Sequence, residues 1–440
     1  MSRREGRAIA GPRHLAAGAS ILLCVGCGGR SSLENRYLDA ASGGHDFAVA
    51  GSAPVDSSQG SKPSHSGGGA PSNGGALSAG GQGGAVSILA APDPYRTPPT
   101  FCSVAEWCGS NANFVAIWGS SATDIWIVAN QVGDVAGSKM LTDSDERSAL
   151  LHWDGVAWNA VQFEGTHALH SVWGTAKDDV WVVGASAFVQ HFDGKTWSAL
   201  PLSIGAPVDF TSISGTSSRD VWAVGWGRTV RHFDGAAWSV AEPTQWDTFR
   251  SVWASADEVW VLGDKTLNRF DRTVWSTVDR PADSVTSTVW GRAPGEAWLA
   301  GPAGLLERWS SNVEQSNSVP YDSSAANFRC VWGSSDRDGW AVGEKGRIAH
   351  FSDGKWSAGP HLTESNLNAA WGTQGKTWFV GDNGAFLEFD GKDFSASPIA
   401  THKLNRLWGT SASDVWAAGR ELEHWDGNRW QDVPRPGFRE

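Results

Sequence analysis

The sequence predicts an all-β protein, a β-propeller of eight four-stranded blades. A Trp-rich unit recurs about every 41 residues from residue 114 onward. Each copy contains four short runs rich in Val, Trp, Phe and Thr, and turn residues separate these runs. None of the runs is long enough for a helix. Short antiparallel strands repeated at this period are the signature of propeller blades.

The composition supports this class and excludes others. The 440 residues include 27 Trp and 53 Gly, and the formal charge is −12. An acidic chain lacks the basic surface that nucleic-acid binding needs, so we expect no nucleic-acid partner. Five Cys are too few for a disulfide-stapled miniprotein or a repeated zinc array.

The repeat is defined by Trp positions. One copy reads SVWGTAKDDVWVVGASAFVQHFDGKTWSALP over residues 171–201. The first Trp position holds Trp118, Trp173, Ser214, Trp253, Trp290, Trp332, Trp371 and Trp408. The second holds Trp126, Trp181, Trp222, Trp260, Trp298, Trp340, Trp378 and Trp416, and the third holds Trp158, Trp197, Trp238, Trp275, Trp356 and Trp430.

Eight copies place the propeller at residues 114–435. Packing the blades around an axis would bury their faces, and Trp is large enough to fill the wedge between them. The first copy begins with its first strand and the last ends with its fourth, so closure needs no strand exchange. Seven blades with one degenerate unit are the alternative, because the fifth copy loses its third turn (ERWSSN).

The first 26 residues predict a secretory signal peptide. Four Arg precede an apolar run of about 12 residues, and spanning a bilayer takes about 20. The run ends at Cys27, and the junction resembles a bacterial lipobox, in which the Cys is acylated. The resemblance implies lipidation of Cys27 and an exported, outer membrane-anchored lipoprotein facing the cell surface or the periplasm. An ordinary signal peptide with two incidental Cys is the alternative.

The segments before the propeller differ in composition. Residues 27–100 predict a lipidated N-terminus and a disordered Gly/Ser-rich linker, because so few large apolar groups cannot offset the entropy of ordering. Residues 101–113 hold Cys102 and Cys108, for which we expect a disulfide, with two unpaired thiols as the alternative. Cys330 lies within a repeat, where we expect a small buried hydrophobic residue.

Two polar positions recur in the repeat. An acid lies two residues before the second Trp in seven copies, as in Asp179, and we expect it to accept backbone N–H bonds and hold the turn. A His–aromatic–Asp–Gly turn recurs at His152, His191, His232 and His424, with His350 in a variant form. A residue repeated round a ring predicts the same structural role each time, so we expect neither a metal site nor a catalytic base.

These motifs resemble known families. The D-G-x-x-W turn resembles the Asp-box of sialidase-like propellers, where it is a structural turn. The tandem VWG, DVWAVG and HWDG repeats resemble those of exported bacterial lipoproteins, and are similar to tectonin-type propellers, which include surface lectins. These resemblances imply a propeller and a binding role. The repeats here are longer than tectonin units, so no ligand-binding position is carried over.

The candidate binding residues lie where the repeat is broken. Trp226 and Trp246 fall in the strand two-to-three and inter-blade connections, which emerge on one face of the ring. Exposed aromatic rings stack on sugars, so the pair predicts a glycan or peptide site; loop-on-loop packing is the alternative. The further candidates on this face are Arg228, Asp247, Lys265, Lys345, Asp382 and Arg420, with Asp143 and Asp145 in the long insertion over residues 131–148.

We therefore expect a monomeric, non-catalytic binding lipoprotein whose partner is a glycan or an envelope protein, with no cofactor. The alternative is a glycan-active enzyme, a sialidase-like hydrolase or lyase. The Arg-rich sialidase motif is missing from the sequence, as are the nucleophile-elbow, metalloprotease, P-loop and dinucleotide motifs.

Overall fold

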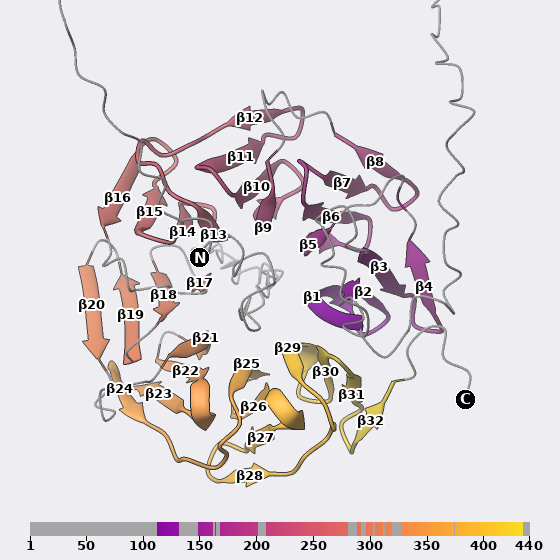
Figure 1. Ribbon diagram of the computed structural model, residues 1–440, viewed down its shortest axis with the longest axis vertical. Coiled ribbons are helices and arrows are strands. Elements are labelled where there is room, and N and C mark those ends of the chain that lie inside the picture. Colours follow the sequence, from indigo (N-terminus) through magenta and orange to yellow (C-terminus); the bar gives the residue numbers. More distant parts are fainter. Residues whose placement is uncertain are drawn as a thin grey trace, which may run out of the picture. The chain divides into compact units, whose positions relative to one another are not determined.

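Eight four-stranded antiparallel sheets form a closed ring in the computed structural model, which confirms the eight-bladed propeller (Figure 1). Each sheet keeps the chain order of its strands, and the first strand of each lies nearest the axis. The structure describes residues 112–131, 148–161, 163, 168–200, 208–279, 288–291, 296–301, 304–310, 313–318, 327–335, 337–373 and 375–433. The expected signal peptide, linker, Cys27, Cys102 and Cys108 lie outside these residues.

Blades one to four follow the first half of the repeat array. Their strands are β1 (Ala112–Ser121), β2 (Asp124–Gln131), β3 (Ser148–Trp153) and β4 (Trp158–Val161); β5 (Leu169–Ala176), β6 (Asp179–Gly184), β7 (Val189–Phe192) and β8 (Trp197–Ala199); β9 (Phe210–Ser217), β10 (Asp220–Gly225), β11 (Thr229–Phe233) and β12 (Trp238–Val240); and β13 (Phe249–Ala254), β14 (Val259–Gly263), β15 (Thr266–Phe270) and β16 (Trp275–Asp279).

Blades five to eight complete the ring. Their strands are β17 (Thr288–Trp290), β18 (Glu296–Ala300), β19 (Leu305–Ser310) and β20 (Val313–Ser318); β21 (Phe328–Ser335), β22 (Asp338–Gly343), β23 (Ile348–Ser352) and β24 (Lys355–Ala358); β25 (Leu367–Thr373), β26 (Lys376–Gly381), β27 (Phe386–Phe389) and β28 (Phe394–Ala396); and β29 (Leu404–Ser411), β30 (Asp414–Gly419), β31 (Leu422–Trp425) and β32 (Trp430–Asp432). Two short 3-10 turns, η3 (Glu344–Gly346) and η4 (Asp382–Gly384), join the second and third strands of blades six and seven.

Neighbouring blades meet at interfaces that we call seams, and most seams contain a Trp ring packed on a Gly. The first Trp of one blade covers the Gly that follows the first Trp position of the next. A Cβ atom on Gly174 would lie 2.8 Å from Cη2 of Trp118, so only Gly leaves room for the ring. The same contact closes the circle, since a Cβ atom on Gly119 would lie 2.6 Å from Cη2 of Trp408.

The seam between blades three and four is built differently. Ser214 occupies the first Trp position, and Ala254 occupies the Gly position of the next blade. Oγ of Ser214 accepts a hydrogen bond from the Ala254 amide at 3.3 Å. Arg272 of blade four donates to both carboxylate oxygens of Asp220 in blade three at 2.8 Å. Because Ser214 is smaller than Trp, the seam has room for the Ala254 methyl group. The Arg272–Asp220 ion pair then joins blades three and four.

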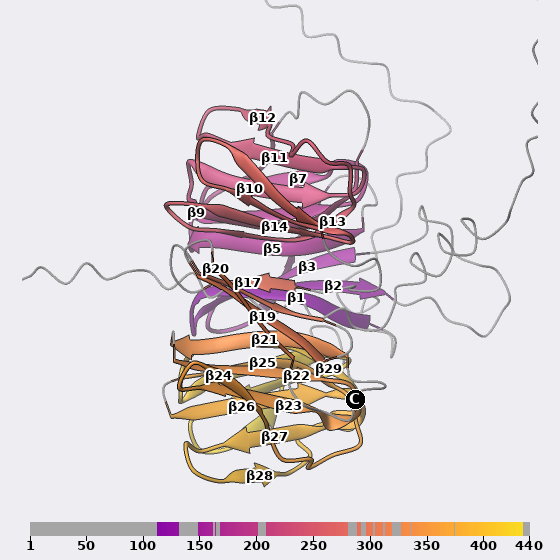
Figure 2. The same cartoon turned by 90° about the vertical axis from the view of Figure 1, so that its left-hand side faces the viewer.

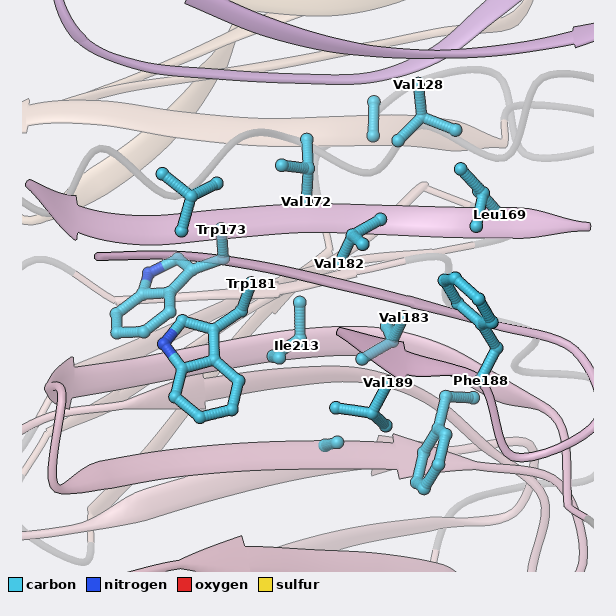
Figure 3. Close-up of a cluster of buried hydrophobic side chains, with 14 of the residues drawn as sticks. Val128, Leu169, Val172, Trp173, Trp181, Val182, Val183, Phe188, Val189 and Ile213 are labelled. Atoms are coloured by element: carbon cyan, nitrogen blue, oxygen red, sulfur yellow. The ribbon is translucent and has the colours of Figure 1, made fainter. Parts of the chain in front are cut away.

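A second set of Trp contacts crosses the seams toward the outside of the ring. The third Trp of one blade packs edge-on against the second Trp of the blade before it, as Trp197 does on Trp126 with ring centroids 5.4 Å apart. Trp158 of blade one packs in this way on Trp416 of blade eight at 5.8 Å. Aliphatic residues and Phe188 lie in the cluster around blade two (Figure 3), which also contains Phe210 and Phe233. The predicted filling of the wedges by Trp is confirmed.

Polar bonds near the axis tie the first strands together. Seven of these strands contain a β-bulge at one repeat position, which leaves one residue outside the ladder. In several blades its side chain reaches the next blade. The bonds of this kind are His170 to the Phe210 carbonyl at 2.6 Å, Thr211 to the Phe249 carbonyl at 2.9 Å, Arg329 to Asn368 at 2.8 Å, Asn368 to the Leu404 carbonyl at 3.0 Å and Asn405 to Asn113 at 2.7 Å.

Cys330 corrects one expectation. It is fully buried in β21, as predicted, and packs in the cluster that contains Trp332 and Leu367. It is disulfide-bonded, however, and so is not a thiol acting only as a small hydrophobic residue. The other four cysteines of the chain lie outside the described residues.

Glu423 is a buried acid in blade eight. It is 4% exposed on β31 and has no hydrogen-bond or ion-pair partner among the described residues. Burial, together with the negative charges of Asp432 and Glu421, raises the pKa of its carboxyl to about 8. The carboxyl is therefore protonated in the folded protein at neutral pH.

Replacing Gly174 by Ala should destabilise the fold, because the new Cβ atom would lie 2.5 Å from the Asp179 carbonyl oxygen and 2.8 Å from the Trp118 ring. Overpacking of this kind costs about 1–3 kcal/mol. Urea unfolding measures the loss. The control is Ala254→Gly, at the seam without the Trp ring, where only about 0.5–1 kcal/mol should be lost. Equal losses in the two variants would contradict this account of the seam.

Glu423→Gln should flatten the dependence of stability on pH. The folded pKa lies above the unfolded value of 4.5, so the folded state binds the extra proton between pH 4.5 and about 8. Unfolding free energy therefore falls as pH rises through this window, by up to about 1.4 kcal/mol per pH unit. Urea unfolding at pH 5, 6.5 and 8 should show the parent losing more stability than the variant. Parallel pH profiles would show that Glu423 does not titrate in this way.

Candidate binding face

The ring has two faces with different connections (Figure 2). Connections between strands one and two and between strands three and four emerge on the first, which we call the turn face. Connections between strands two and three and between blades emerge on the second, which we call the loop face. Its described segments include 185–188, 208–209, 226–228, 241–248, 264–265, 344–347, 359–366, 382–385, 397–403 and 420–421.

On the turn face, a repeated network joins four side chains. In blade two, Asp179 accepts hydrogen bonds from Nε1 of Trp181 at 2.9 Å and from Thr175, and contacts Nε2 of His191 at 2.8 Å. The His191 ring stacks on Trp181 with centroids 4.1 Å apart. Burial opposes ionisation of Asp179, but the bonds from His191, Thr175 and Trp181 outweigh it and lower its pKa. The charged carboxylate thus has its partners within the blade.

The network keeps one acid–base pair in every blade, although the residue types change. Five blades pair Asp with His: Asp124–His152, Asp179–His191, Asp220–His232, Asp338–His350 and Asp414–His424. Two pair a longer acid with a longer base, Glu258–Arg269 at 2.6 Å and Glu296–Arg308 at 2.9 Å. Blade seven inverts the order, with Lys376 and Glu388 at 2.9 Å. The paired exchange confirms that these His and acid residues have a structural role.

The repeated acids before the second Trp do not hold the turn in the way that we expected. We expected them to accept backbone N–H bonds, but a neighbouring hydroxyl does this in several turns, as Oγ of Ser217 accepts from the Arg219 amide at 3.2 Å. The Asp–Gly turn does hold backbone amides. Asp193 accepts from the Lys195 and Thr196 amides at 2.9 and 2.8 Å. Gly194 has φ 88, in the left-handed region that favours Gly.

On the loop face, Trp246 is exposed on a loop fixed at both ends. It is 72% exposed and is the only aromatic residue among the exposed large apolar residues of the described part. Before it, Glu242 accepts ion-pair contacts from Arg228 at 3.1 Å and Arg231 at 2.6 Å. After it, Asp247 binds the flanking turns. The loop therefore presents the ring to solvent from a fixed backbone.

Asp247 is buried and has a structural role. It is 3% exposed, and one carboxylate oxygen accepts from the Lys265 amide at 2.9 Å, the Thr266 amide at 2.8 Å and the Thr266 hydroxyl at 2.8 Å. The Asp247 carbonyl accepts from the Arg228 amide at 2.7 Å. A buried, fully bonded carboxylate is a poor ligand group, so Asp247 positions the loop that carries Trp246.

The other candidates differ in availability. Trp226 is only partly exposed and its carbonyl accepts from Thr229 at 2.6 Å, so it does not match Trp246 in exposure. Lys265, Lys345 and Arg420 are exposed at turn tips. Asp382 contacts Arg329 at 3.8 Å and Lys403 at 3.6 Å, which engages its carboxylate. Asp143 and Asp145 lie outside the described residues.

Sequence reasoning missed a group of interacting polar side chains beneath this face, which consists of Arg329, Glu344, Asn368, Asp382 and Lys403. Arg329 bonds Asn368 of the next blade and pairs with Glu344 at 3.3 Å. Burial lowers the pKa of Lys403, and the Asp382 charge only partly opposes this. The signal in the sequence was a polar residue at one position of otherwise apolar first strands.

Within the described ranges, no group of three or more His, Cys, Asp or Glu side chains is placed to hold a metal ion. Among the same residues, none of the helices is both long and apolar enough to cross a membrane.

Comparison with known proteins shows the fold alone. No family model matches the chain, and no curated protein matches it. The chain is similar to the computationally designed protein Ika8, with TM-score 0.55, 9% identity, and 72% of this chain and 96% of that one covered. It is similar to the C-terminal WD40 domain of Sif2, with TM-score 0.50, 11% identity, and coverage of 74% and 97%. A structure of YCF48 bound to D1 peptide matches at TM-score 0.46 and 18% identity, with coverage of 60% and 92%.

Proposed function

We propose that this protein is a non-catalytic binding module whose loop face contacts a glycan or an envelope protein. The observation that carries the proposal is the exposure of Trp246 on a loop held by Glu242 on one side and Asp247 on the other. Hiding a large ring in a partner gains free energy, and exposed aromatic residues mark interaction sites.

Rigidity of the loop favours binding. A side chain on a fixed backbone loses little freedom when a ligand binds, so more of the contact energy appears as affinity. The Arg228–Glu242 pair and the Asp247 bonds supply this rigidity from blades three and four. The turn face offers a contrast, because its repeated acids and His residues bind one another within the blades.

The location of the protein is part of the proposal. The N-terminal sequence supports export and acylation of Cys27 at the outer membrane. The Gly/Ser-rich composition of residues 27–100 supports a role for this segment as a linker between the acylated N-terminus and the propeller. We propose a monomer without a cofactor.

Trp246→Ala should weaken ligand binding at least tenfold, about 1.4 kcal/mol, while the fold stays intact. The measurement is a binding screen of the purified protein against glycan arrays and solubilised envelope proteins, followed by titration of each hit. Val274→Ala is the control, since Val274 is 62% exposed in a turn-face connection. Hits that bind the Trp246 variant as tightly as the parent would overturn the proposed site.

A further inference from the structure

We infer that a second site on the loop face, in blade six, binds a small aliphatic zwitterion, a free amino acid or a dipeptide. The inference goes beyond the proposed function, because none of the residues lining this site belongs to the loop that carries Trp246. The site is a cavity of about 230 Å³ between two loops. Residues 345–348 form one wall, and residues 359–361 with Glu364 form the other.

Hydrogen bonds fix the two walls of the cavity to each other. The Lys345 amide donates to Oδ1 of Asn366 at 3.0 Å, and Nε2 of His361 donates to the Lys345 carbonyl at 3.0 Å. The Gly359 amide donates to the Ile348 carbonyl at 2.8 Å. The walls are therefore preorganised, and a ligand loses little affinity to ordering them.

The two walls carry charges of opposite sign. Lys345 is exposed and forms no ion pair among the described residues, and Arg347 adds a second base on its wall. Glu364 is exposed on the other wall. Its carboxylate lies 3.8 Å from Nε2 of His361, an atom that already donates to the Lys345 carbonyl. Close ion pairs therefore neutralise neither Lys345 nor Glu364 in the described part of the chain.

Glu344 precedes Lys345 in the chain but does not neutralise it. The Glu344 carboxylate binds Arg329 at 3.3 Å and accepts from the Asn327 side chain at 3.0 Å. Glu344 also does not line the cavity. The charge of Lys345 thus remains available to a ligand.

Opposite charges on the two walls favour a ligand that carries both signs. An anion would meet Glu364 and the net charge of −12, and a cation would meet Lys345 and Arg347. A neutral ligand would cover part of both charges and pair with neither, and a charge covered without a partner costs free energy. A zwitterion can place its carboxylate at Lys345 and its ammonium group at Glu364, so it matches both walls.

The size and the apolar surface of the cavity limit the ligand further. Pockets for drug-sized ligands measure about 300–1,000 Å³, so a cavity of about 230 Å³ suits a smaller molecule. Ile348, which is 1% exposed, lines the cavity together with Pro360 and adds apolar surface to it. An amino acid or a dipeptide with an aliphatic side chain combines the small size, the two charges and the apolar surface.

The test titrates the full protein with leucine and with alanyl-leucine at low salt, by calorimetry. Each probe is compared with its N-acetyl form, which lacks the ammonium charge, and with its amide, which lacks the carboxylate charge. We expect at least one of the two free probes to bind, and its capped forms to bind at least threefold more weakly, since exposed ion pairs are individually weak. The preference should shrink as salt rises.

Single substitutions assign each charge of the ligand to one wall. Glu364→Gln should remove the preference over the N-acetyl form and keep the preference over the amide. Lys345→Met should remove most of the preference over the amide and keep the preference over the N-acetyl form. Lys355→Met and Asp353→Asn, at exposed positions of a turn-face connection in the same blade, are the controls and should keep both preferences.

Three results would overturn the inference. Failure of both leucine and alanyl-leucine to bind would exclude this class of zwitterion. Capped forms that bind as tightly as the free forms would show that charge does not select the ligand. Preferences that survive both Glu364→Gln and Lys345→Met would place the binding elsewhere on the protein. The proposed function would still be decided by the screen with Trp246→Ala.

Discussion

The closed propeller depends on one repeated contact, in which a Trp indole packs on a Gly of the next blade. A four-stranded sheet alone exposes both of its faces, and the seams bury them. Because the Gly lacks a Cβ atom, the indole lies directly on the backbone, as Trp118 does on Gly174 and Trp408 does on Gly119. The repeated VWG motif therefore determines the spacing between blades and also marks the first strand of each blade.

Much of the fold was predictable because this contact leaves a periodic signal. The Trp positions predicted the number of blades and the strand order, and Ser214 stood out as the one departure at the first Trp position. Ala254 and Arg272 could not be connected to it from sequence alone. Arg272 stands at a Gly position with φ 71 and reaches Asp220 in another blade, and such a contact depends on packing across the seam.

The candidate site was predictable only in part. Breaks in the repeat pointed to Trp246, and its exposure confirms that it is available to solvent. The same reasoning selected Asp247, which is buried, because a sequence does not show that a carboxylate points inward at two backbone amides. The two faces differ in role. The repeated acid–base pairs of the turn face stabilise the blades, whereas the connections of the loop face differ from one blade to the next.

A double-mutant cycle at the seam between blades five and six tests the role of the Trp–Gly contact most directly. A Cβ atom on Gly333 would lie 3.1 Å from Cζ3 of Trp290 and 3.2 Å from the Asp338 carbonyl. Gly333→Ala should destabilise the parent, and should cost much less beside Trp290→Ser, which copies the Ser214–Ala254 seam. We predict a coupling energy of at least about 1 kcal/mol in urea unfolding. Additive effects of the two changes would contradict the claim that Trp–Gly contact sets the spacing of the blades.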